Sequence, residues 1–375
     1  MNIKMLDLKG QYDKIKSEID NAIQGVLNHT GFIQGAEVAK FENNLGEFTG
    51  SEYVISCANG TDALQIAMMA LDLKPGDEVI VPAFTYVATA EVIALLGLIP
   101  VLVDVDPQDF NISINDIERS ITKRTKAIVP VHLFGQSADM EPIMEIAKKH
   151  SLYVIEDVAQ ALGAQYRWSS GKVSSCGTIG DIGCTSFFPS KNLGCFGDGG
   201  AIFTSNKELA KRIKMIANHG QEKKYYHDLI GCNSRLDTLQ AAILDVKLKY
   251  LKGYQVARQK CAENYRNLLS SVEGLTLPKE FERSTHVYHQ FTLKIDKDRS
   301  EFVDYLKERG VPTMIYYPLP LHKQKAFEDI SIRRVDLLNS ECLSKRVVSL
   351  PIHTELTLEE QNYISDVIID FFKAK

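Results

Sequence analysis

The chain has 375 residues, of which 45% are hydrophobic and 24% are charged, the balance of an ordinary globular protein long enough for about two structural units. Its formal net charge of -5 argues against nucleic acid or an anionic membrane as the main partner. The longest apolar stretch, 92–103, is interrupted by Gly97 and Pro100 and falls short of the ~18 residues of a membrane span. The charged first residues contain no apolar signal segment, and none of the seven cysteines belongs to a C-x-x-C pair. We therefore expect a cytoplasmic protein with reduced cysteines and no bound metal.

The first predicted element is a helix that ends near residue 29, followed by the loop GFIQG at 31–35. Between about residues 50 and 205, short β-branched runs alternate with longer helical patterns. This alternation is typical of βαβ units, in which helices cover both faces of a parallel sheet. The segments that contain the apolar runs are 53–60, 77–84, 99–106, 126–136 and 152–160. Functional loops of such a sheet gather at the carboxyl ends of its strands, so we expect the site there.

The pattern changes after the region 207–270, which is predicted to be a connecting helical span with interspersed charges. A strand-like run follows at 287–295, and the chain closes with a predicted helix at 356–375. We therefore predict an α/β fold with a large domain over 1–250, built on a mostly parallel sheet between helices. A smaller C-terminal α/β domain is predicted over 251–375.

Lys191 lies in the segment TSFFPSKNLGCFGDGGA, after an apolar run and before a glycine-rich stretch. Elsewhere in the chain, lysines stand among other charged residues. Partial desolvation lowers the pKa of an amine, which is what a Schiff-base lysine requires. The segment alone is equally compatible with a structural lysine whose stem packs on apolar neighbours.

Asp157 ends the apolar run LYVIED, at the end of a predicted buried strand. A buried carboxylate is costly unless it has a cationic partner. One such partner is the protonated pyridine nitrogen of pyridoxal 5'-phosphate (PLP), and this pairing keeps the ring an electron sink. Gln160 would then lie beneath or beside the ring. An aspartate at this place can equally be the N-cap of a following helix.

The segment 57–62 joins a predicted strand to an amphipathic helix. Gly60 lets the backbone approach a ligand closely, and Thr61 offers a hydroxyl and an N–H at a helix N-terminus, which suits a phosphate. Ser186, shortly before the lysine, can add a second hydroxyl. Phe84, at another strand end, can stack on the pyridine ring, although a single phenylalanine is more often part of the core.

A Gly-Thr turn, a strand-end aspartate about a hundred residues later and a Ser-Phe-Phe-Pro-Ser-Lys segment form an ordered set. This set resembles the fold-type I PLP enzymes, which have the aspartate aminotransferase-like fold, and specifically the DegT/StrS family of nucleotide-sugar aminotransferases. The similarity covers essentially the whole chain. It runs from LDLKGQY through SCANGTDALQI, FTYVATAE, VIEDVAQ, TSFFPSKNLGCFGDGGAIF and NSRLDTLQAAIL to GVPTMIYYPLPLHKQ.

The resemblance implies that Lys191 forms the Schiff base with PLP and that Asp157 pairs with the pyridine nitrogen. It implies that Gln160 and Phe84 contact the ring from opposite sides. Asn233 matches the residue that the family sends across a dimer interface to the partner's phosphate, which implies a homodimer with shared active sites. The residues expected to hold the phosphate from within the same subunit are Gly60, Thr61 and Ser186.

Within the family, the chain most resembles the aminotransferases of UDP-2-acetamido-2-deoxy-3-oxo-glucuronate. They aminate carbon 3 of a UDP-linked uronic acid for bacterial surface polysaccharide (O-antigen), and the amino donor that the family implies is L-glutamate. The residues expected near the sugar are Thr30, Phe32, Ser190, Arg235, Tyr316, Tyr317 and His322.

Three of these positions depart from the subgroup, in which Phe32 can be Tyr, Thr30 can be Gly and Tyr316 is His. Amination of another UDP- or dTDP-linked keto-sugar at carbon 3 or 4 is therefore an alternative. Arg235 can also be a structural residue in an ion pair with a helix carboxylate. Two further alternatives are a sugar dehydratase, in which His replaces the Schiff-base lysine, and a non-catalytic sugar-binding or regulatory protein on the same fold. The segment 167–177 is slightly longer than usual and has no assigned function.

Overall fold

The structure, a computed structural model, describes residues 3–373, so residues 1–2 and 374–375 of the predicted domains lie outside the described part. The strands of the two sheets are β1 (Tyr53–Cys57), β2 (Glu78–Pro82), β3 (Ile99–Val103), β4 (Thr125–Ile128), β5 (Tyr153–Asp157), β8 (Ile182–Ser186), β9 (Gly200–Thr204), β12 (Leu275–Thr276), β13 (Phe291–Ile295), β14 (Arg333–Arg334) and β15 (Val347–Leu350). The strands of two separate hairpins are β6 (Gln165–Arg167), β7 (Val173–Ser175), β10 (Gln221–Lys223) and β11 (Tyr226–His227).

The α-helices are α1 (Leu8–Lys14), α2 (Lys16–His29), α3 (Ala36–Thr49), α4 (Gly60–Ala70), α5 (Ala88–Leu95), α6 (Ile114–Ser120), α7 (Met140–His150), α8 (Lys207–Ala217), α9 (Thr238–Leu248), α10 (Leu251–Leu269), α11 (Arg299–Glu308), α12 (Leu338–Arg346) and α13 (Leu358–Lys373). Short 3₁₀ turns occur at Leu133–Gly135, Leu321–Lys323 and Lys325–Phe327. Within residues 3–373, no helix combines the length and the apolar character that crossing a membrane requires.

The large sheet has eight strands in the order β1-β9-β8-β5-β4-β2-β3-β14. The neighbours from β8 to β14 pair in parallel, whereas β9 runs antiparallel to both β1 and β8. Strand β1 therefore points the same way as β8. As a result, the carboxyl ends of β1, β2, β4, β5 and β8 all meet at one edge of the sheet. The predicted α/β fold with a mostly parallel sheet is confirmed.

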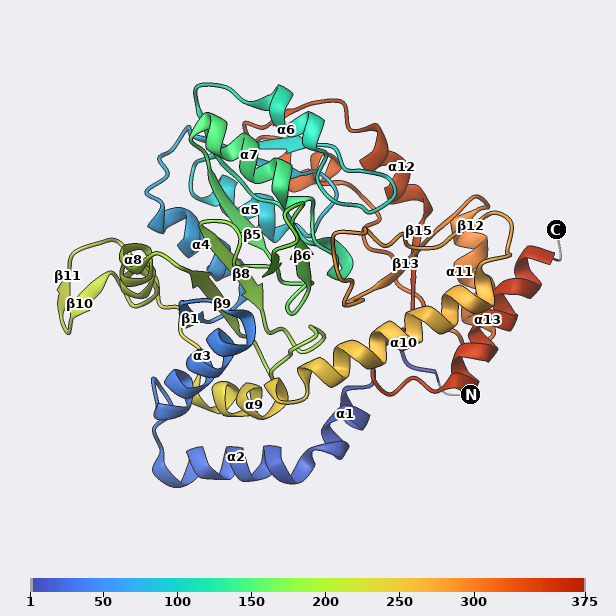
Figure 1. Ribbon diagram of the computed structural model, residues 1–375, viewed down its shortest axis with the longest axis horizontal. Helices are drawn as coiled ribbons and strands as arrows, with labels where there is room; N and C mark the ends of the chain where they lie inside the picture. Colours follow the sequence, from blue (N-terminus) through green and yellow to red (C-terminus); the bar gives the residue numbers. More distant parts are fainter. Residues whose placement is uncertain (1–2, 374–375) are drawn as a thin grey trace.

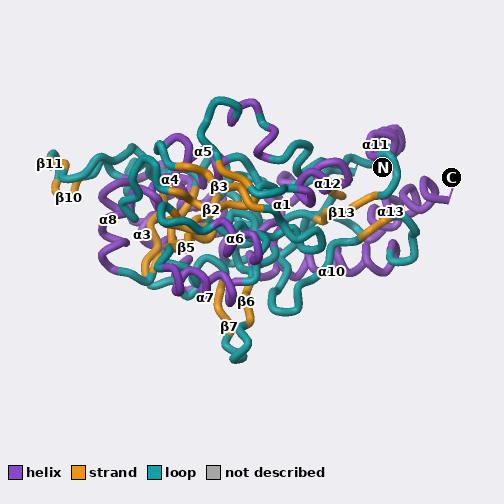
Figure 2. Tube along the Cα trace, turned by 90° about the horizontal axis from the view of Figure 1, so that it is seen from above, coloured by secondary structure: helices purple, strands orange, loops and turns teal. Residues whose placement is uncertain are grey.

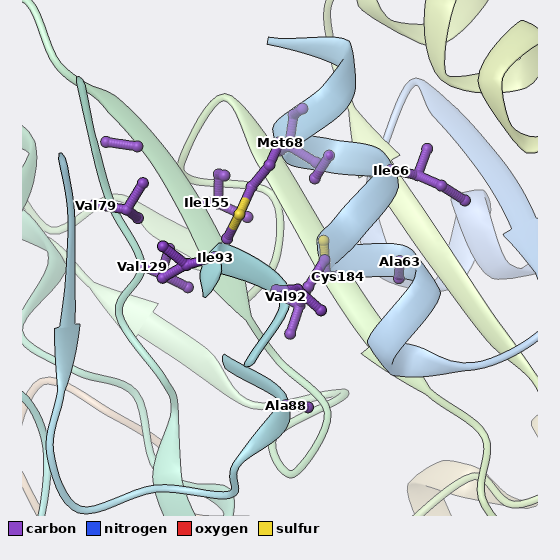
Figure 3. Close-up of a cluster of buried hydrophobic side chains, with 14 of the residues drawn as sticks. Ala63, Ile66, Met68, Val79, Ala88, Val92, Ile93, Val129, Ile155 and Cys184 are labelled. Atoms are coloured by element: carbon purple, nitrogen blue, oxygen red, sulfur yellow. The ribbon is translucent and has the colours of Figure 1, made fainter. Parts of the chain in front are cut away.

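Helices cover both faces of this sheet, and strand β2 shows how. Its side chains are buried along the whole strand: Val79 and Val81 pack with α4, α5 and α8, whereas Ile80 packs with α6 and α7. This alternation follows because successive side chains of a strand point to opposite faces. Figure 3 shows Met68 reaching from α4 towards Ile155 of β5. A sheet covered on both faces needs continuous apolar runs, which is the pattern that predicts these strands from the sequence.

A second, antiparallel sheet, β12-β13-β15, lies in the C-terminal part of the chain, where α10, α11 and α13 pack around a separate core. The long helix α10 connects the two parts (Figure 1), because Leu251 packs with the large sheet's core and Leu269 with the second core. Strand β14 returns to the large sheet and pairs with β3. The chain after residue 250 therefore contributes strands to both sheets, and a domain division at residue 250 stays a prediction.

The predicted helical span 207–270 is interrupted, which corrects the expectation from the sequence. Helix α8 ends at Ala217, and the hairpin β10–β11 projects from the body before α9 begins (Figures 1 and 2). Gly220 takes a φ of +70°, and a Cβ there would lie 1.7 Å from the Leu229 carbonyl oxygen. Only glycine tolerates both the left-handed backbone and this close approach, so the helix cannot continue.

The segment 167–177 belongs to the hairpin β6–β7, which projects from one side of the molecule (Figure 2). The Trp168 ring packs edge-on against Tyr166, with ring centroids 5.5 Å apart, and its Nε1–H donates to Ser174 Oγ at 3.0 Å. The tryptophan thus stabilises the hairpin itself.

Candidate active site

A cavity of about 650 Å³ opens at the carboxyl edge of the large sheet. Its walls come from the loops after β1, β2, β4, β5 and β8 and from two segments of the C-terminal part. A site at this edge is expected for a parallel sheet. The lining residues are Asn59, Gly60, Thr61, Leu64, Thr85, Tyr86, Ala88, Val131, Asp157, Ala159, Gln160, Ser186, Phe188, Ser190, Lys191, Asp198, His289, Gln290, Tyr316 and Tyr317.

Lys191 and Asp157 are brought into this cavity from neighbouring strands, since β8 leads to Lys191 and β5 ends at Asp157. Burial lowers the pKa of Lys191, and the negative charge of Asp157 opposes this shift. A desolvated amine beside an anion is the environment of a reactive lysine rather than of a solvated surface lysine. Of the two alternatives that the sequence leaves open for Lys191, the geometry favours the reactive one.

The Asp157 carboxylate is held by two hydrogen bonds. Its Oδ1 accepts from the Ala159 N–H at 3.1 Å, and its Oδ2 accepts from Thr89 Oγ1 at 3.1 Å. Burial raises the pKa of Asp157, while the bond from Ala159 and the charge of Lys191 oppose the rise. The described residues directly after Asp157 form turns and not a helix, so its alternative role as an N-cap is not realised. A buried carboxylate whose pKa is raised can be stabilised further by a cationic partner.

The N-terminus of α4 forms one end of the cavity. Asn59 is the N-cap, because its Oδ1 accepts from the Asp62 N–H at 2.8 Å, and this leaves the Thr61 hydroxyl free of the capping role. A Cβ on Gly60 would lie 2.7 Å from the Cβ of Ser186, so only glycine lets the helix end and Ser186 pack this closely. Backbone N–H groups at a helix N-terminus and adjacent hydroxyls are a phosphate-binding arrangement.

These residues fit PLP. The cavity contains a desolvated amine, a buried carboxylate in need of a cation, and a helix N-terminus with hydroxyls that suits a phosphate. The three features correspond to the aldehyde, the pyridine nitrogen and the phosphate of the cofactor. Within residues 3–373, no group of His, Cys, Asp and Glu side chains is arranged to hold a metal ion.

Gln160 is fixed by two hydrogen bonds in the cavity wall. Its Oε1 accepts from the Phe134 N–H at 2.8 Å, and its Nε2 donates to the Tyr317 hydroxyl at 3.0 Å. Phe84, in contrast, lies outside the lining: its ring is 1% exposed and packs against Phe110 and the edge of Tyr317. This corrects the expectation that Phe84 touches the cofactor ring. The aromatic residue of the same loop that lines the cavity is Tyr86, which is 57% exposed.

The residues expected near the sugar divide into two groups. Ser190, Tyr316 and Tyr317 line the cavity. Thr30 and Phe32 are exposed on the loop after α2 and do not reach the cavity of their own chain.

Arg235 and Asn233 also lie away from the cavity. The Arg235 guanidinium donates to Asn218 Oδ1 at 3.0 Å, and among residues 3–373 it forms no ion pair with a carboxylate. Asn233 is exposed. His322 pairs with Glu341, with 2.9 Å between Nε2 and Oε1. The structure of a single chain therefore leaves Thr30, Phe32, Asn233, Arg235 and His322 outside the cavity.

Eleven of the twenty lining residues are absent from the set expected from the sequence, and those with polar or ionisable side chains include Tyr86, Asp198, His289 and Gln290. Tyr86 and Asp198 lie in motifs that the sequence already singles out, so a wider window around each motif would have included them. His289 and Gln290 come just before β13, in the C-terminal part. Their sequence pattern reads only as a strand, and no spacing connects them to the other motifs.

The fold and the cavity together define a PLP-dependent aminotransferase of the fold-type I class. The chain belongs to the DegT/DnrJ/EryC1/StrS aminotransferase family, whose profile matches residues 13–369. It is similar to the UDP-2-acetamido-2-deoxy-3-oxo-D-glucuronate aminotransferase of Pseudomonas aeruginosa, with 50% identity over 354 residues, 94% of this chain and 96% of that protein. A Geobacillus stearothermophilus protein named "Pleiotropic regulatory protein" is 46% identical over 375 residues, 100% of this chain and 99% of that protein.

Among solved structures, a DegT DnrJ EryC1 StrS aminotransferase from Brucella abortus has a TM-score of 0.94 with this chain. The two are 40% identical, and the match covers 99% of each chain. The predicted family, fold and cofactor are confirmed: the chain is a PLP-dependent sugar aminotransferase.

Proposed function

We propose that the protein aminates carbon 3 of UDP-2-acetamido-2-deoxy-3-oxo-glucuronate, with L-glutamate as the amino donor, for bacterial surface polysaccharide (O-antigen) synthesis. The observation that carries the reaction type is that a desolvated Lys191 and a buried Asp157 line one cavity. The choice of sugar is supported by the 50% identity to the Pseudomonas aeruginosa enzyme of that name.

PLP supplies, when bound, an electron sink that stabilises negative charge at the reacting carbon. Lys191 would join the cofactor covalently and, after displacement by the amino donor, carry a proton between the donor's α-carbon and the cofactor. Burial lowers the pKa of Lys191, which increases the fraction of free amine at neutral pH. The free amine is the form that attacks a carbonyl and accepts a proton, so burial prepares Lys191 for both tasks.

The other residues of the cavity would bind and orient. Asp157 would pair with the protonated ring nitrogen, and this cation would bring down the carboxyl pKa that burial raises. Gly60, Thr61 and Ser186 would hold the phosphate at the N-terminus of α4. Tyr86, which lines the cavity where Phe84 does not, is the aromatic residue that we assign to the ring, with Gln160 as the second ring contact.

We further propose a homodimer with shared active sites. Asn233 follows the projecting hairpin β10–β11 (Figure 2), on which Tyr225 and Tyr226 are 79% and 63% exposed. Exposed aromatic side chains on a projecting hairpin are a typical surface for a second subunit. A second copy of the chain would cover this hairpin and bring Asn233 and Arg235 to the neighbouring cavity. Thr30, Phe32 and His322 stay predicted sugar contacts.

Complementation between two variants tests the shared site. Lys191→Ala and Asn233→Ala should each be impaired, whereas unfolding and refolding them together should form hybrid dimers with one complete site. In a statistical mixture, the activity should then recover to about a quarter of the wild-type value. A mixture no more active than its components would contradict the shared site, and refolded single variants serve as controls.

The reaction type is tested by colour and by chemical trapping. The purified protein should be yellow, and borohydride should bleach it and fix the cofactor on Lys191, as peptide mass spectrometry would show. The Lys191→Ala variant is the control. A colourless protein that PLP cannot reconstitute would instead favour the second candidate, a regulatory protein, to which the name of the Geobacillus relative points.

The sugar is tested by a panel of UDP- and dTDP-linked keto-sugars incubated with L-glutamate, with 2-oxoglutarate release as the readout. The UDP-linked 3-oxo-uronate should be consumed fastest. Rapid turnover of a 4-keto-sugar with none of the 3-oxo-uronate would move the assignment to carbon 4, the alternative that the departures at Thr30, Phe32 and Tyr316 leave open.

A further inference from the structure

His289 brings an imidazole into the wall of the cavity that contains Lys191, and the functions proposed so far do not use it. The residue is 6% exposed and lies at the end of the segment 286–290, just before strand β13. A polar ring buried in the wall of a reaction cavity needs either a structural partner or a task in the reaction.

The segment around His289 is attached to both flanks of the cavity. The Val287 N–H donates to the Gly135 carbonyl at 2.8 Å, and the Gln290 N–H donates to the Phe134 carbonyl at 3.3 Å. Gly135 has a φ of +107°, and a Cβ there would lie 2.9 Å from the backbone nitrogen of His289. On the other flank, Asn192, next to Lys191, donates from Nδ2 to the Val287 carbonyl at 3.5 Å. These contacts fix the backbone that carries His289 between the residues after β4 and the neighbour of Lys191.

Arg258, a buried residue of α10, holds the backbone of the segment 286–290 by hydrogen bonds. Its Nη1 donates to the carbonyls of Tyr288 at 3.0 Å, His289 at 3.4 Å and Ile352 at 2.9 Å. Burial first, and then the positive charges of Lys191 and Arg258, hold the pKa of His289 well below its ordinary value. The ring is therefore neutral and carries one N–H and one lone pair.

His289 Nδ1 is buried and has no hydrogen-bond partner among residues 3–373. A buried N–H without an acceptor costs more than an unfilled lone pair, so we assign the proton to Nε2 and the lone pair to Nδ1. Within residues 3–373, the ε-amine of Lys191 has no hydrogen-bond partner either. The cavity wall thus holds an unfilled acceptor and an unpaired donor, and the donor sits on a flexible side chain.

We propose that His289 is a positioning residue for Lys191: its Nδ1 accepts a hydrogen bond from the ε-amine whenever that amine is not joined to the cofactor. The inference rests on the proposed role of Lys191. Lys191 is free during half of a transamination cycle, and it must then stay beside the reacting carbon without occupying the place of the sugar. A neutral acceptor on the wall holds the amine there, and the nearby charge of Arg258 prevents the imidazole from taking its proton.

The readout is the reactivity of Lys191 in the pyridoxamine-phosphate form of the holoenzyme. A small amine-selective reagent is applied at neutral pH, and the modification of Lys191 is followed by peptide mass spectrometry. A hydrogen bond to a charged donor is stronger than one to a neutral donor, so removal of the acceptor favours the reactive free amine. We expect Lys191 to react about fivefold faster in His289→Leu, and His289→Asn to approach wild type because its amide oxygen replaces Nδ1.

Steady-state kinetics give a second readout. His289→Leu should lower kcat while leaving the KM for the sugar unchanged, since the proposed bond forms with Lys191 and not with the substrate. His286→Leu is the matched control. His286 is also 6% exposed and lies in the same segment, but its Nδ1 accepts from the Tyr288 N–H at 3.0 Å and it does not line the cavity. An equal effect of His286→Leu on the reactivity of Lys191 would mean that the segment matters only for packing, and would overturn the proposal.

Unchanged reactivity of Lys191 in His289→Leu would also overturn it. Should the substitutions prevent folding, a crystal structure of the wild-type pyridoxamine form decides, with a Lys191 Nζ to His289 Nδ1 distance of about 2.7–3.2 Å expected. A Lys191 amine directed elsewhere in that structure would refute the inference. Borohydride trapping of the wild-type protein separates the two failures. If Lys191 is not trapped, the proposed function fails, whereas trapping without an effect of His289 refutes only this inference.

Discussion

Replacing Asp157 by Asn should lower the activity while stabilising the protein without its cofactor. Removing one partner of a buried charge pair costs about 3–5 kcal/mol, so the loss of the pairing with the ring nitrogen should reduce kcat about 10²- to 10⁴-fold. The amide oxygen of Asn can still accept from the Ala159 N–H, as Oδ1 of Asp157 does at 3.1 Å. The change therefore removes the charge with little loss of the local hydrogen bonding.

The effect on stability has the opposite sign. Burial raises the pKa of Asp157 above its ordinary 3.8, so the folded apo-protein binds this proton more tightly than the unfolded chain does. Ionisation therefore costs stability as the pH rises from 3.8 through the raised pKa, and the full cost is present once the pH exceeds that raised pKa. A single stabilising substitution typically contributes about 0.5–2 kcal/mol. For 375 residues this corresponds to a rise of about 1–3 °C in the Tm of the apo-protein.

Glu156, on the same strand, is the matched control because its carboxylate is fully paired within the protein. Its Oε1 accepts from the N–H groups of Ile179 and Gly180 at 2.6 and 2.7 Å, and its Oε2 accepts from the Gly177 N–H at 2.8 Å and from His132 Nε2 at 2.9 Å. Gln in its place must turn an NH₂ group towards two donors. Glu156→Gln should therefore destabilise the protein by about 2–5 kcal/mol.

The two variants are compared by the Tm of the apo-proteins and by kcat with L-glutamate, per molecule of bound PLP. Asp157→Asn should raise the Tm and abolish most of the activity, whereas Glu156→Gln should lower the Tm by about 3–6 °C and reduce kcat less than about tenfold. A Tm that falls in Asp157→Asn, or a kcat above about a tenth of wild type, would refute the reasoning that this carboxylate serves the cofactor.

Gly60→Ala should weaken PLP binding about tenfold, because its methyl carbon would lie 2.7 Å from the Cβ of Ser186; unchanged affinity in a PLP titration would exclude this turn from the phosphate site. Tyr86→Ala should also weaken PLP binding about tenfold without changing the apo-protein's Tm, whereas Phe84→Ala should lower the free energy of unfolding by about 3–5 kcal/mol; the reverse pattern would return the ring contact to Phe84. Lys247 is buried and its pKa is lowered to about 8, so the unfolded chain binds more protons between about pH 8 and 10.5 and stability should rise across that window. Urea titrations at the two ends of this pH window measure the free energy of unfolding, and Lys247→Met should lack its rise with pH. An equal rise with pH in the variant and the wild type would contradict this.

The sequence is sufficient to predict the site residues that lie at the carboxyl ends of strands. Gly60, Asp157, Ser186 and Lys191 each follow an apolar run at or near its carboxyl end, and all four line one cavity. This works because the carboxyl ends of parallel strands meet at one edge of a sheet, so position along the chain predicts proximity in space. The order and character of these motifs also determine the family, as the profile match over 13–369 bears out.

Only the tertiary structure decides which residues of one loop, and which residues of distant segments, line the cavity. Phe84 and Tyr86 are two positions apart, and the turn after β2 sends the first into the core and the second into the cavity. His289 lines the same cavity as Lys191 because the C-terminal part folds back against the residues after β4, a contact that no local pattern encodes. The sequence by itself thus determines the strand-end chemistry of Lys191 and Asp157. What surrounds that chemistry depends on packing, because side-chain direction and long-range contacts are properties of the folded chain.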